Sequence, residues 1–490
     1  MGNNGHKLKK RGVKLSIYFL SLLIVAIAAI GGTYAWIGRS VTLPSTVEII
    51  QGTNSSTLDI AASERIGAVY QTLLNNYVEG VDKEALIEGA LSGMVEAVGD
   101  PYSQYLNTEE SENLDETISA SFEGIGAEIM SLNQQIVIVS PIKGSPAEKA
   151  GLLPNDIILS ADGESLQGLT ASEAVALIRG EKGSEVVLEI VRGDQTFKVN
   201  ITRDTIPIET VTFELDEEYP EIGIVHVSSF STPTYDDIVS AVTDLRTQGA
   251  TSFVFDFRQN PGGLLDQALK ISNMFLDDGD VIMQTQEKDA EPNKIVASDS
   301  EFGDFKITEP SVLLVDEGSA SASEIVAGAL QESSEIPLVG TTTFGKGTVQ
   351  TVYPLTESSE LKLTVAKWLT PNGNWIHQKG IAVDYEVALP AYATLTIIDS
   401  TATYEEGTVS EEVKNVEAML NAIGYAVEAD GYYDEATAEQ VASFQAANEL
   451  DATGIVTGDT ALAIVEKLRE VLTENDTQYD KAVEILMGNE

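Results

Sequence analysis

The fold of this chain is decided by the stretch Val312–Gln350, which reads VLLVDEGSASASEIVAGALQESSEIPLVGTTTFGKGTVQ. It opens with a short apolar run, Val312–Val315, that is typical of a buried strand. A turn and then a helical pattern, Glu324–Leu330, follow. A second apolar strand, Ile336–Val339, leads into the tripeptide Gly345-Lys346-Gly347. A buried strand, a helix and a second buried strand in succession predict an α/β core.

Three serines, Ser319, Ser321 and Ser323, fall on the predicted turn between the strand and the helix. The first N–H groups of a helix have no partner within it, so they point at whatever such a serine attacks. Lys346 follows the next strand, which suggests a Ser/Lys pair of nucleophile and base. Burial beside Phe344 is expected to lower the pKa of this lysine. Serines at a helix start are also ordinary N-caps, and that reading stays open here.

Two other chemistries compete for the same residues. The segment Gly340–Lys346 resembles a phosphate-binding loop, but Gly347 stands where that loop needs Ser or Thr. A Ser-His-Asp triad needs a histidine, and the chain has only His6, His226 and His377. The first precedes an apolar segment, the second lies in a strand-like run, and the third has no acidic neighbour in sequence. Lysine is therefore the better candidate base.

Three segments carry a resemblance to a known family. Gly318–Glu324, Phe344–Gln350 and Asp256–Gly263 resemble the active-site signature of the carboxyl-terminal processing peptidases. Asp256 and Glu324 themselves are interpreted as structural. The resemblance assigns roles to Ser321 as nucleophile, Lys346 as general base, Gln350 as the residue that orients the lysine, and the N–H groups of Ala322 and of Gly262 or Gly263 as oxyanion donors.

Length and composition limit the remaining possibilities. A chain of 490 residues with 43% hydrophobic residues is long enough for three or so domains with sizeable cores. It has no cysteine, which excludes disulfides, thiol nucleophiles and thiolate metal sites. Three scattered histidines argue against zinc, and no Asp-x-Asp-x-Asp-Gly calcium loop is present. We therefore expect no metal and no cofactor.

The N-terminus reads as a membrane anchor. Five basic residues precede the nearly unbroken apolar run Leu15–Ile37, which as a helix would span roughly 34 Å at about 1.5 Å per residue. The basic residues predict that the N-terminus stays in the cytoplasm and that the rest of the chain is exported. A cleaved signal peptide is the alternative, but Thr33-Tyr34-Ala35 is a poor cleavage site and the run is long for one.

The predicted exported part is strongly acidic. The whole chain carries 29 basic and 77 acidic residues, a formal net charge of −48. Five of the basic residues and none of the acidic ones lie before the end of the apolar run. Such a surface repels nucleic acid and anionic lipid headgroups, so we expect no nucleic-acid partner.

The stretch Phe122–Arg203 resembles a PDZ domain through Ser145–Leu152 and Asn155–Ile158, with a helix expected at Ala171–Ile178. Successive N–H groups in a Gly-rich turn form a nest for an anion, and an exposed strand edge accepts an extended peptide. The free C-terminus of a protein supplies both. The residues implicated in binding it are Gly124, Ile125, Gly126 and Ala127 in the loop, and Arg179, which resembles an arginine through which family members sense the bound peptide.

The remaining segments complete the predicted organisation. Asp82 is expected to cap the second of two helices between Ile60 and Val98, a region that in the family can mediate dimerisation. Asp100–Leu106 resembles a family segment that packs beside the catalytic core.

The predicted parts are 1–37, basic tail and transmembrane anchor; 38–115, tether and helical region; 116–205, barrel-like PDZ domain; 206–399, α/β peptidase core; 408–472, small three-helix domain; and 473–490, C-terminal helix.

An internal repeat marks the small domain. Gly431 with Thr437 recurs as Gly454 with Thr460, an offset of 23 residues. Each copy is a turn leading into a capped helix, with apolar positions expected at Val441 and Phe444 or at Leu462 and Ile464. The segment resembles the type 1 peptidoglycan-binding domain, and the alternative is a generic three-helix bundle.

Together these features predict a multi-domain, membrane-anchored extracellular serine endopeptidase located at the cell wall. It would recognise protein C-termini through its PDZ domain and cleave near them. One alternative is a proteolytically idle PDZ scaffold on the wall, which the intact Ser321, Lys346 and Gln350 argue against. A wall-lytic hydrolase is a third reading, but it lacks the carboxylate pair or metal that such chemistry needs.

Overall fold

The computed structural model describes residues 60–356 and 358–488, and the chain divides into two compact units, residues 1–87 and 88–490. The first unit contains α2 (Ile60–Asn76) and the start of α3 (Lys83–Glu96). Asp82 caps α3, because its carboxylate accepts the N–H groups of Glu84 and Ala85. The two predicted helices are therefore confirmed, whereas dimerisation through them stays a prediction.

The predicted membrane span, Leu15–Ile37, lies outside the described residues. Across residues 60–356 and 358–488, every helix is too short or too polar to cross a bilayer.

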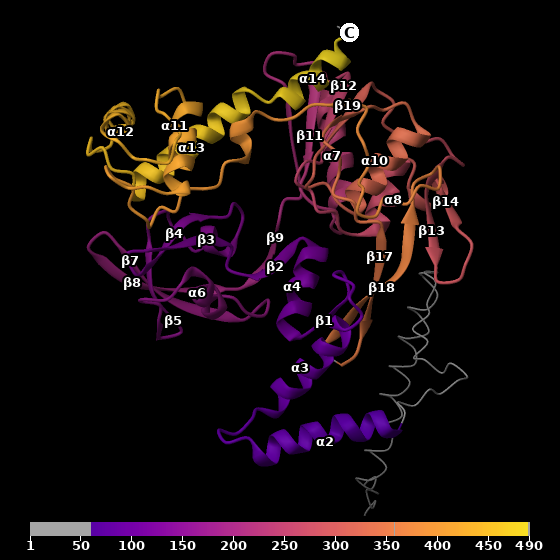
Figure 1. The fold of residues 1–490 in the computed structure, drawn as a ribbon, viewed down its shortest axis with the longest axis horizontal. Coiled ribbons are helices and arrows are strands. Elements are labelled where there is room, and N and C mark those ends of the chain that lie inside the picture. The colour runs from indigo at the N-terminus through magenta and orange to yellow at the C-terminus, as the bar shows by residue number, and fades with distance from the viewer. Residues whose placement is uncertain (1–59, 357, 489–490) are drawn as a thin grey trace, which may run out of the picture. The chain divides into compact units, whose positions relative to one another are not determined.

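Residues 121–207 form a sheet-rich module (Figure 1). Its strand β7 (Glu185–Arg192) shows the period-2 alternation of a half-buried strand, since Val186, Leu188 and Ile190 are all fully buried. Helix α6 has the predicted bounds, Ala171–Ile178. The strands of the main sheet run in the order β3 (Ala127–Leu132), β4 (Gln135–Pro141), β5 (Ile157–Ala161), β7 and β8 (Gln195–Thr202), and β6 (Glu164–Ser165) pairs with β5. A separate two-stranded sheet pairs β2 (Ser121–Gly124) with β9 (Asp204–Pro207). The short helix α5 spans Pro146–Lys149.

The α/β core is built on a six-stranded sheet. Only its first strand is antiparallel to its neighbour, and all the others are parallel. Every residue of the two central strands is buried, as expected for a sheet covered on both faces. The order is β10 (Val211–Leu215), β11 (Ile222–Val227), β12 (Ser252–Asp256), β15 (Ser311–Val315), β16 (Leu338–Gly340) and β19 (Tyr385–Glu386).

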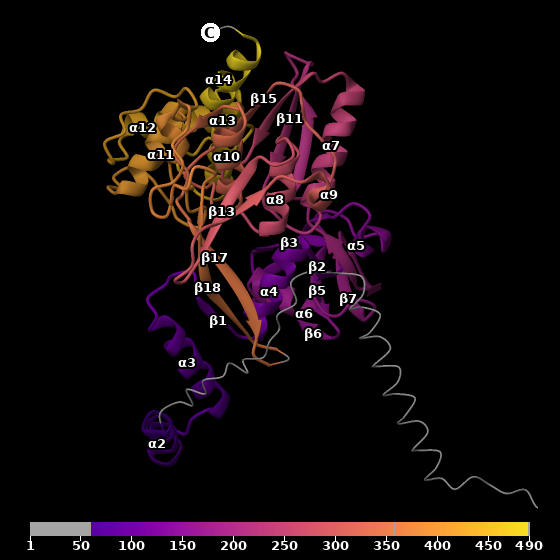
Figure 2. The same ribbon diagram turned by 90° about the vertical axis from the view of Figure 1, so that its right-hand side faces the viewer.

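Different helices cover the two faces of this sheet (Figures 1 and 2). On one face, α7 (Thr234–Gln248), α8 (Leu265–Asn273) and α10 (Ala322–Ser333) enclose the largest apolar cluster. On the other, α14 (Thr477–Leu486) packs its buried residue Ala482 against strand side chains. The helix expected near the C-terminus is therefore present, and it is part of the α/β core.

A second, antiparallel sheet extends the core (Figure 1). Strand β17 (Thr348–Pro354) begins two residues after Lys346 and pairs with β18 (Glu360–Leu369). The other edge of β18 is shared: β1 pairs with residues 360–362 and β13 with residues 366–369, which leaves 363–365 between them. The remaining elements here are β1 (Gln104–Leu106), β13 (Val281–Glu287), β14 (Asn293–Val296), α4 (Thr108–Ser119), α9 (Asp299–Phe302) and the 3-10 helix η1 (Ala391–Thr394).

A separate apolar cluster forms the core of a three-helix module. Its helices are α11 (Glu411–Ala422), α12 (Glu435–Ala447) and α13 (Gly458–Glu474). Buried positions in α13 differ from the prediction, because Leu462 is 59% exposed while Ala461 is buried beside Ile464. The module lies in sequence between β19 and α14, so it is an insertion within the α/β core.

Candidate active site

Ser321 immediately precedes α10, at the turn that leads from β15 into the helix. Its φ of 54° and ψ of −108° are a strained conformation for a residue with a side chain, which costs about 1–3 kcal/mol. The hydroxyls of Ser319 and Ser323 donate to the carbonyls of Phe257 and Asn260. Within the described part of the chain, the Ser321 hydroxyl donates no hydrogen bond. Two of the three serines thus brace the turn, and Ser321 is the one whose proton is uncommitted.

The buried carboxylate of Glu324 connects the serine turn to the lysine segment. One of its oxygens accepts the N–H groups of Ser321 at 2.9 Å and Lys346 at 2.8 Å. The other accepts the N–H of Gly345 at 2.7 Å and the hydroxyl of Thr343 at 2.6 Å. Glu324 is completely buried, so these four donors replace the water that a carboxylate otherwise requires. Glu324 therefore has a structural role, as interpreted from the sequence: its carboxylate holds the two candidate catalytic segments together.

The glycine loop after β12 lies against the same turn. A Cβ on Gly262 would come within 2.5 Å of the carbonyl oxygen of Ala320 and 2.8 Å of the nitrogen of Ala322, so only glycine fits. The N–H of Gly262 donates to the side chain of Asn260 at 2.9 Å. The N–H of Gly263, by contrast, makes no hydrogen bond with the described residues. Of the two glycine candidates, Gly263 is therefore the one whose N–H is uncommitted, while Gly262 is the one that lies directly against Ala322.

Lys346 is partly buried beside an aromatic ring. Its Nζ lies 5.1 Å from the centre of the Tyr102 ring. Burial lowers the pKa of Lys346 and the charge of Lys362 lowers it further, while the carboxylates of Glu324 and Asp100 partly oppose both effects. The lowered pKa has the predicted direction. The aromatic ring recorded beside the amine is that of Tyr102, while the side chain of Phe344, the expected neighbour, is 54% exposed.

Gln350 does not contact Lys346 in this arrangement. Its side-chain nitrogen donates to the hydroxyl of Thr348 at 2.9 Å and to that of Thr364 at 3.0 Å. Over residues 60–356 and 358–488, no hydrogen bond joins Lys346 Nζ to Gln350 or to Ser321. The role of Gln350 in orienting the lysine stays a prediction.

His226 belongs to a different network. Its Nδ1 lies 3.6 Å from the carboxylate of Asp256, which Arg258 binds through two nitrogens. Burial opposes ionisation of Asp256, but the hydrogen bonds from His226 and Arg258 outweigh it and lower the pKa of Asp256 to about 2. Arg258 also binds Asp476 at 2.7 Å, just before α14. Asp256 and His226 therefore help to hold the C-terminal helix on the core.

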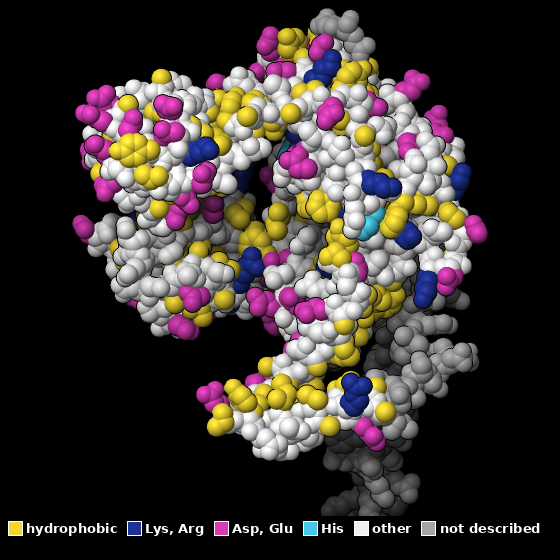
Figure 3. Space-filling model, in the orientation of Figure 1, with side chains coloured by type: hydrophobic (Ala, Val, Ile, Leu, Met, Phe, Trp, Pro, Cys, Tyr) yellow, Lys and Arg dark blue, Asp and Glu magenta, His cyan; other side chains and the backbone are white. Residues whose placement is uncertain are grey.

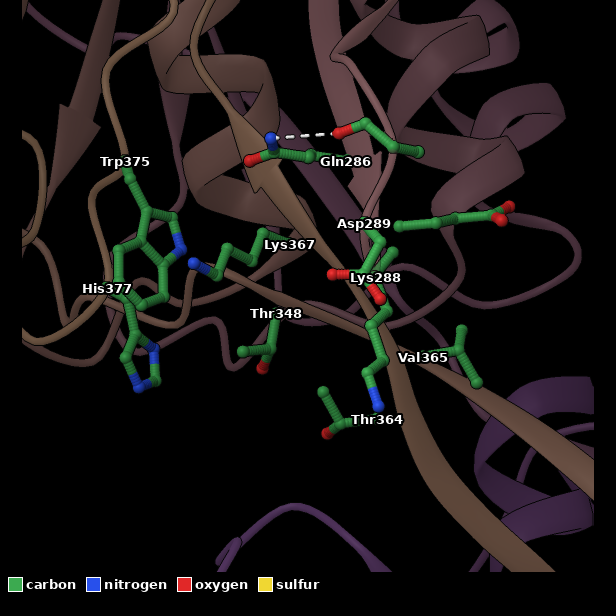
Figure 4. A pocket seen from close by; sticks show the side chains of 12 residues that line it. Gln286, Lys288, Asp289, Thr348, Thr364, Val365, Lys367, Trp375 and His377 are labelled. Carbon is green, nitrogen blue, oxygen red and sulfur yellow. Dashed lines mark hydrogen bonds between the residues drawn. The ribbon is translucent and has the colours of Figure 1, made fainter.

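His377 lines an open pocket of about 670 Å³ beside the lysine segment (Figure 4). Its ring stacks on Trp375, with 5.2 Å between ring centres, and meets Tyr102 edge-on at 6.1 Å. Gly347 lies at the edges of both rings, because its carbonyl accepts the indole N–H of Trp375 and its N–H donates to Nδ1 of His377. The pocket is lined by Gln286, Glu287, Lys288, Asp289, Ala290, Thr348, Thr364, Val365, Ala366, Lys367, Trp375 and His377.

The predicted carboxylate-binding loop, Gly124–Ala127, joins β2 to β3. Gly126 has a φ of +71°, and a Cβ there would come within 2.5 Å of the Ser145 side chain. Arg179, directly after α6, binds both carboxylate oxygens of Glu116 at 2.8 and 2.9 Å and lies 4.6 Å from the centre of the Phe122 ring. Arg179 is thus already paired with α4, a contact that the sequence did not reveal.

Sequence reasoning missed the part played by Tyr102. The resemblance places the segment Asp100–Leu106 beside the core but does not assign it to the lysine.

The described residues contain no group of three or more His, Cys, Asp or Glu arranged to hold a metal ion.

Family models match four segments of the chain. The model of peptidase family S41 matches residues 221–387, and the PDZ domain model matches residues 137–192. The model described as activating protease CtpB N-terminal domain matches residues 25–110, and a peptidoglycan-binding domain model matches residues 409–464.

Whole-chain relatives extend this similarity. The carboxy-terminal processing protease CtpA of Bacillus subtilis (strain 168) is 43% identical over 478 residues, which cover 97% of this chain and 99% of the relative. A CtpA-like serine protease of Staphylococcus aureus (strain MSSA476) is 36% identical over 97% of this chain and 93% of its own length. Among solved structures, a photosystem II D1 C-terminal processing protease is 29% identical, covering 66% of this chain and 88% of its own, with a TM-score of 0.39. This chain therefore belongs to the carboxy-terminal processing serine proteases of peptidase family S41.

Proposed function

We propose that Ser321 is the nucleophile and Lys346 the general base of this protease. The observation that carries the proposal is the position of Glu324, whose carboxylate binds the N–H groups of both residues. This contact fixes the two segments relative to each other. Burial then favours the neutral amine that a base requires, because it lowers the pKa of Lys346.

The chemistry follows the general scheme of acyl transfer. Neutral Lys346 takes the proton of the Ser321 hydroxyl as the oxygen attacks the scissile carbonyl carbon. The oxyanion that forms is bound by the N–H groups of Ala322 and Gly263. The protonated lysine then gives its proton to the leaving amine, and water releases the acyl group by the same steps. Gln350 is proposed to turn from its threonine partners towards the lysine when substrate is bound.

A set of single variants tests this assignment. Lys346→Arg keeps the positive charge but has no accessible neutral form, so it should be as inactive as Ser321→Ala. His226→Ala and His377→Ala should retain turnover of a peptide substrate. Loss of activity in a folded histidine variant, together with activity in Lys346→Arg, would show that the base has been misassigned.

The PDZ domain is proposed to recognise the free C-terminus of the substrate and to transmit its binding through Arg179. The pair Arg179–Glu116 supports a route, since α4 also contacts the segment beside the glycine loop. The carbonyls of Thr117 and Ile118 accept hydrogen bonds from Ser231 and Thr232. Phe230, just before them, donates its N–H to the carbonyl of Gly262. A ligand shifts such a system only by binding the active arrangement more tightly, typically by about 1–3 kcal/mol.

Rates for two enzymes and two substrates test the route. Arg179→Ala should lower turnover of a folded protein with an apolar C-terminus, as should amidation of that C-terminus with the wild-type enzyme. The two changes together should cost little more than either alone. Additive losses would mean that Arg179 does not sense the carboxylate.

The location is proposed from both ends of the chain. Leu15–Ile37 would anchor the protein in the membrane with its catalytic part outside the cell, and residues 408–472 would bind peptidoglycan at the cell envelope. Because the module is an insertion, the informative variant replaces residues 408–474 with a short linker and keeps α14. It should lose sedimentation with purified cell wall while retaining peptidase activity. Unchanged sedimentation would refute the assigned role of the module.

The competing scaffold and wall-lytic functions make different predictions. Incubation of the protein with casein and with peptidoglycan separates all three. The protease releases casein fragments only, a lytic enzyme releases muropeptides, and an idle scaffold releases neither.

A further inference from the structure

The pocket that His377 lines lies at the interruption in the edge of β18 (Figure 4). Strand β13 stops pairing at Ala366 and β1 starts at Lys362, so the strand pairing is interrupted at Thr364 and Val365, which line the pocket. Within the interruption the N–H of Thr364 donates to the hydroxyl of Ser103 at 3.0 Å. An interruption in a sheet edge gives an extended peptide room to lie against the strand.

The walls of this pocket are attached to the candidate base. Gly347, the residue after Lys346, holds the rings of Trp375 and His377 through its backbone. A Cβ on Gly347 would lie within 2.9 Å of the indole nitrogen of Trp375, so glycine is required for this contact. Tyr102 touches His377 on one side and Lys346 on the other. A substrate whose scissile bond reached Lys346 would therefore pass this pocket within a few residues.

The charge at this pocket departs from the acidic character of the chain. Lys367 and Lys288 both line it, and within the described residues neither forms an ion pair. The ammonium of Lys367 lies 4.2 Å from the centre of the Trp375 ring. Figure 3 shows Lys and Arg side chains gathered around the β13–β14 and β17–β18 region. Glu287 and Asp289 also line the pocket, so its lining carries two acids and two lysines. In Figure 4 Asp289 lies beside Lys288, whereas Lys367 extends towards Trp375.

We propose that the corner formed by Lys367 and Trp375 is a substrate subsite that binds a carboxylate of the peptide. The carboxylate would be either an Asp or Glu side chain or the C-terminal carboxylate of a short tail. The Lys367 ammonium forms no ion pair with the described residues, so it gains a charge-assisted hydrogen bond from this carboxylate, and the adjacent indole covers the aliphatic part of the bound residue. The proposal rests on the peptidase function and names a specificity determinant for it.

Kinetic constants test the subsite. The substrates are decapeptides in which a single Glu is placed at each position in turn. Each has a matched copy with Gln in place of Glu, and every peptide is made with a free and with an amidated C-terminus. Lys367→Met should raise KM about threefold to tenfold for the peptide whose carboxylate occupies the subsite, with kcat unchanged. The Gln or amide copy should be hydrolysed equally by both enzymes. If replacing Glu with Gln abolishes the difference in KM between the two enzymes, the carboxylate is that of a side chain. If amidation of the C-terminus abolishes it, the carboxylate is the C-terminal one.

Lys294→Met is the matched control, because Lys294 lies exposed on β14 and does not line the pocket. It should leave KM unchanged. Equal increases in KM for acidic and neutral peptides would overturn the proposal, since they would show only a change of shape. Identical kinetics for Lys367→Met and the wild-type enzyme with every peptide would overturn it as well.

A binding measurement separates this inference from the assignment of the dyad. In the Ser321→Ala background, the fluorescence of Trp375 reports peptide binding without hydrolysis, with Trp375→Phe identifying the signal. Binding of the acidic peptide should weaken with added salt and with Lys367→Met. If the wild-type enzyme hydrolyses no peptide but this pattern holds, the dyad fails and the subsite stands. If the enzyme hydrolyses peptides but the pattern is absent, the subsite fails and the dyad stands.

Discussion

Replacing Glu417 with glutamine should stabilise the three-helix module in a pH-dependent way. Glu417 is completely buried in α11, and its carboxylate accepts the N–H of Gly431 at 2.9 Å and the hydroxyl of Thr437 at 3.4 Å. The other half of the internal repeat has Gln445 in the corresponding place. Gln445 accepts the N–H of Gly454 at 2.9 Å and donates to the hydroxyl of Thr460 at 3.0 Å. The two halves thus share one contact pattern, built with an acid in one and an amide in the other.

Burial raises the pKa of Glu417, and the nearby Asp430 and Asp434 raise it further, while the bonds from Gly431 and Thr437 offset part of the shift. A carboxyl whose pKa is higher in the folded than in the unfolded chain prefers folding when it is protonated. Its contribution is therefore complete below the unfolded pKa, about 4.3, and is lost as pH rises through the folded value. The protonated acid can donate to Thr437 as Gln445 donates to its threonine.

The size of the effect follows from one hydrogen bond. An amide at position 417 supplies the donor at every pH and removes the cost of a buried negative charge. A neutral hydrogen bond contributes about 0.5–1.5 kcal/mol to stability. For a module of this size, about 1 kcal/mol shifts Tm by roughly 4–8 °C. Glu417→Gln should raise the Tm of the module by about that much at pH 8 and by almost nothing at pH 4.

Calorimetry of the full chain at both pH values measures this difference. The reciprocal variant Gln445→Glu is the control, because Gln445 Nε2 also donates to Thr453 and to the carbonyl of Ile455. It should lower stability, and more at pH 8 than at pH 4. The reasoning is refuted if Glu417→Gln destabilises the module at pH 8, or if its effect is the same at both pH values.

The other predictions concern the catalytic core. Glu324→Gln should cost about 2–4 kcal/mol in urea unfolding and abolish turnover, because its amide nitrogen cannot accept N–H groups; full activity would contradict the bracing role. Gly262→Ala should be folded by circular dichroism but inactive, since its methyl group meets the carbonyl of Ala320; turnover near the wild-type rate would exclude that clash. Ala482→Asp should lower the free energy of unfolding by about 3 kcal/mol or more, because it buries a charge between α14 and the sheet. An unchanged free energy of unfolding would mean that α14 separates easily from the sheet. The contact with Asp256 raises the pKa of His226, so the stability that it adds is complete below about pH 6.5 and is lost as pH rises through the folded value. His226→Ala should therefore lose stability at pH 5 and none at pH 9 in denaturant titrations, and equal losses would rule out this pairing.

Local signals account for what the sequence predicted well. Helix α6 has the predicted bounds, and in the structure Thr170 and Glu173 form a capping box at its start, a signal contained within four residues. Asp82 marked the start of α3 by the same kind of contact. The buried strands around Ser321 are continuous apolar runs, which few other structures can accommodate. These features depend on neighbours within a few residues, so one sequence contains the information.

Contacts between distant segments were not predictable in this way. Nothing near Tyr102 in sequence shows that its ring meets the amine of Lys346, 244 positions further along. Gln350 could be assigned a partner only by resemblance, whereas the threonines that it binds include Thr364 on the next strand. Leu462 looked like a core residue because it is apolar, but the helix turns it outwards. Each case depends on how elements pack, which periodicity does not determine.

The position of α14 has a consequence for the order in which the protein matures. The last described helix covers one face of the sheet that carries the candidate nucleophile, and Arg258 fastens it next to Asp476. Synthesis proceeds from the N-terminus, so the inserted three-helix module is finished before the core can close. A nascent chain would hold Ser321 on a half-covered sheet until α14 has been synthesised. The peptidase core would then be complete only after residues 477–486 have been synthesised and packed on the sheet.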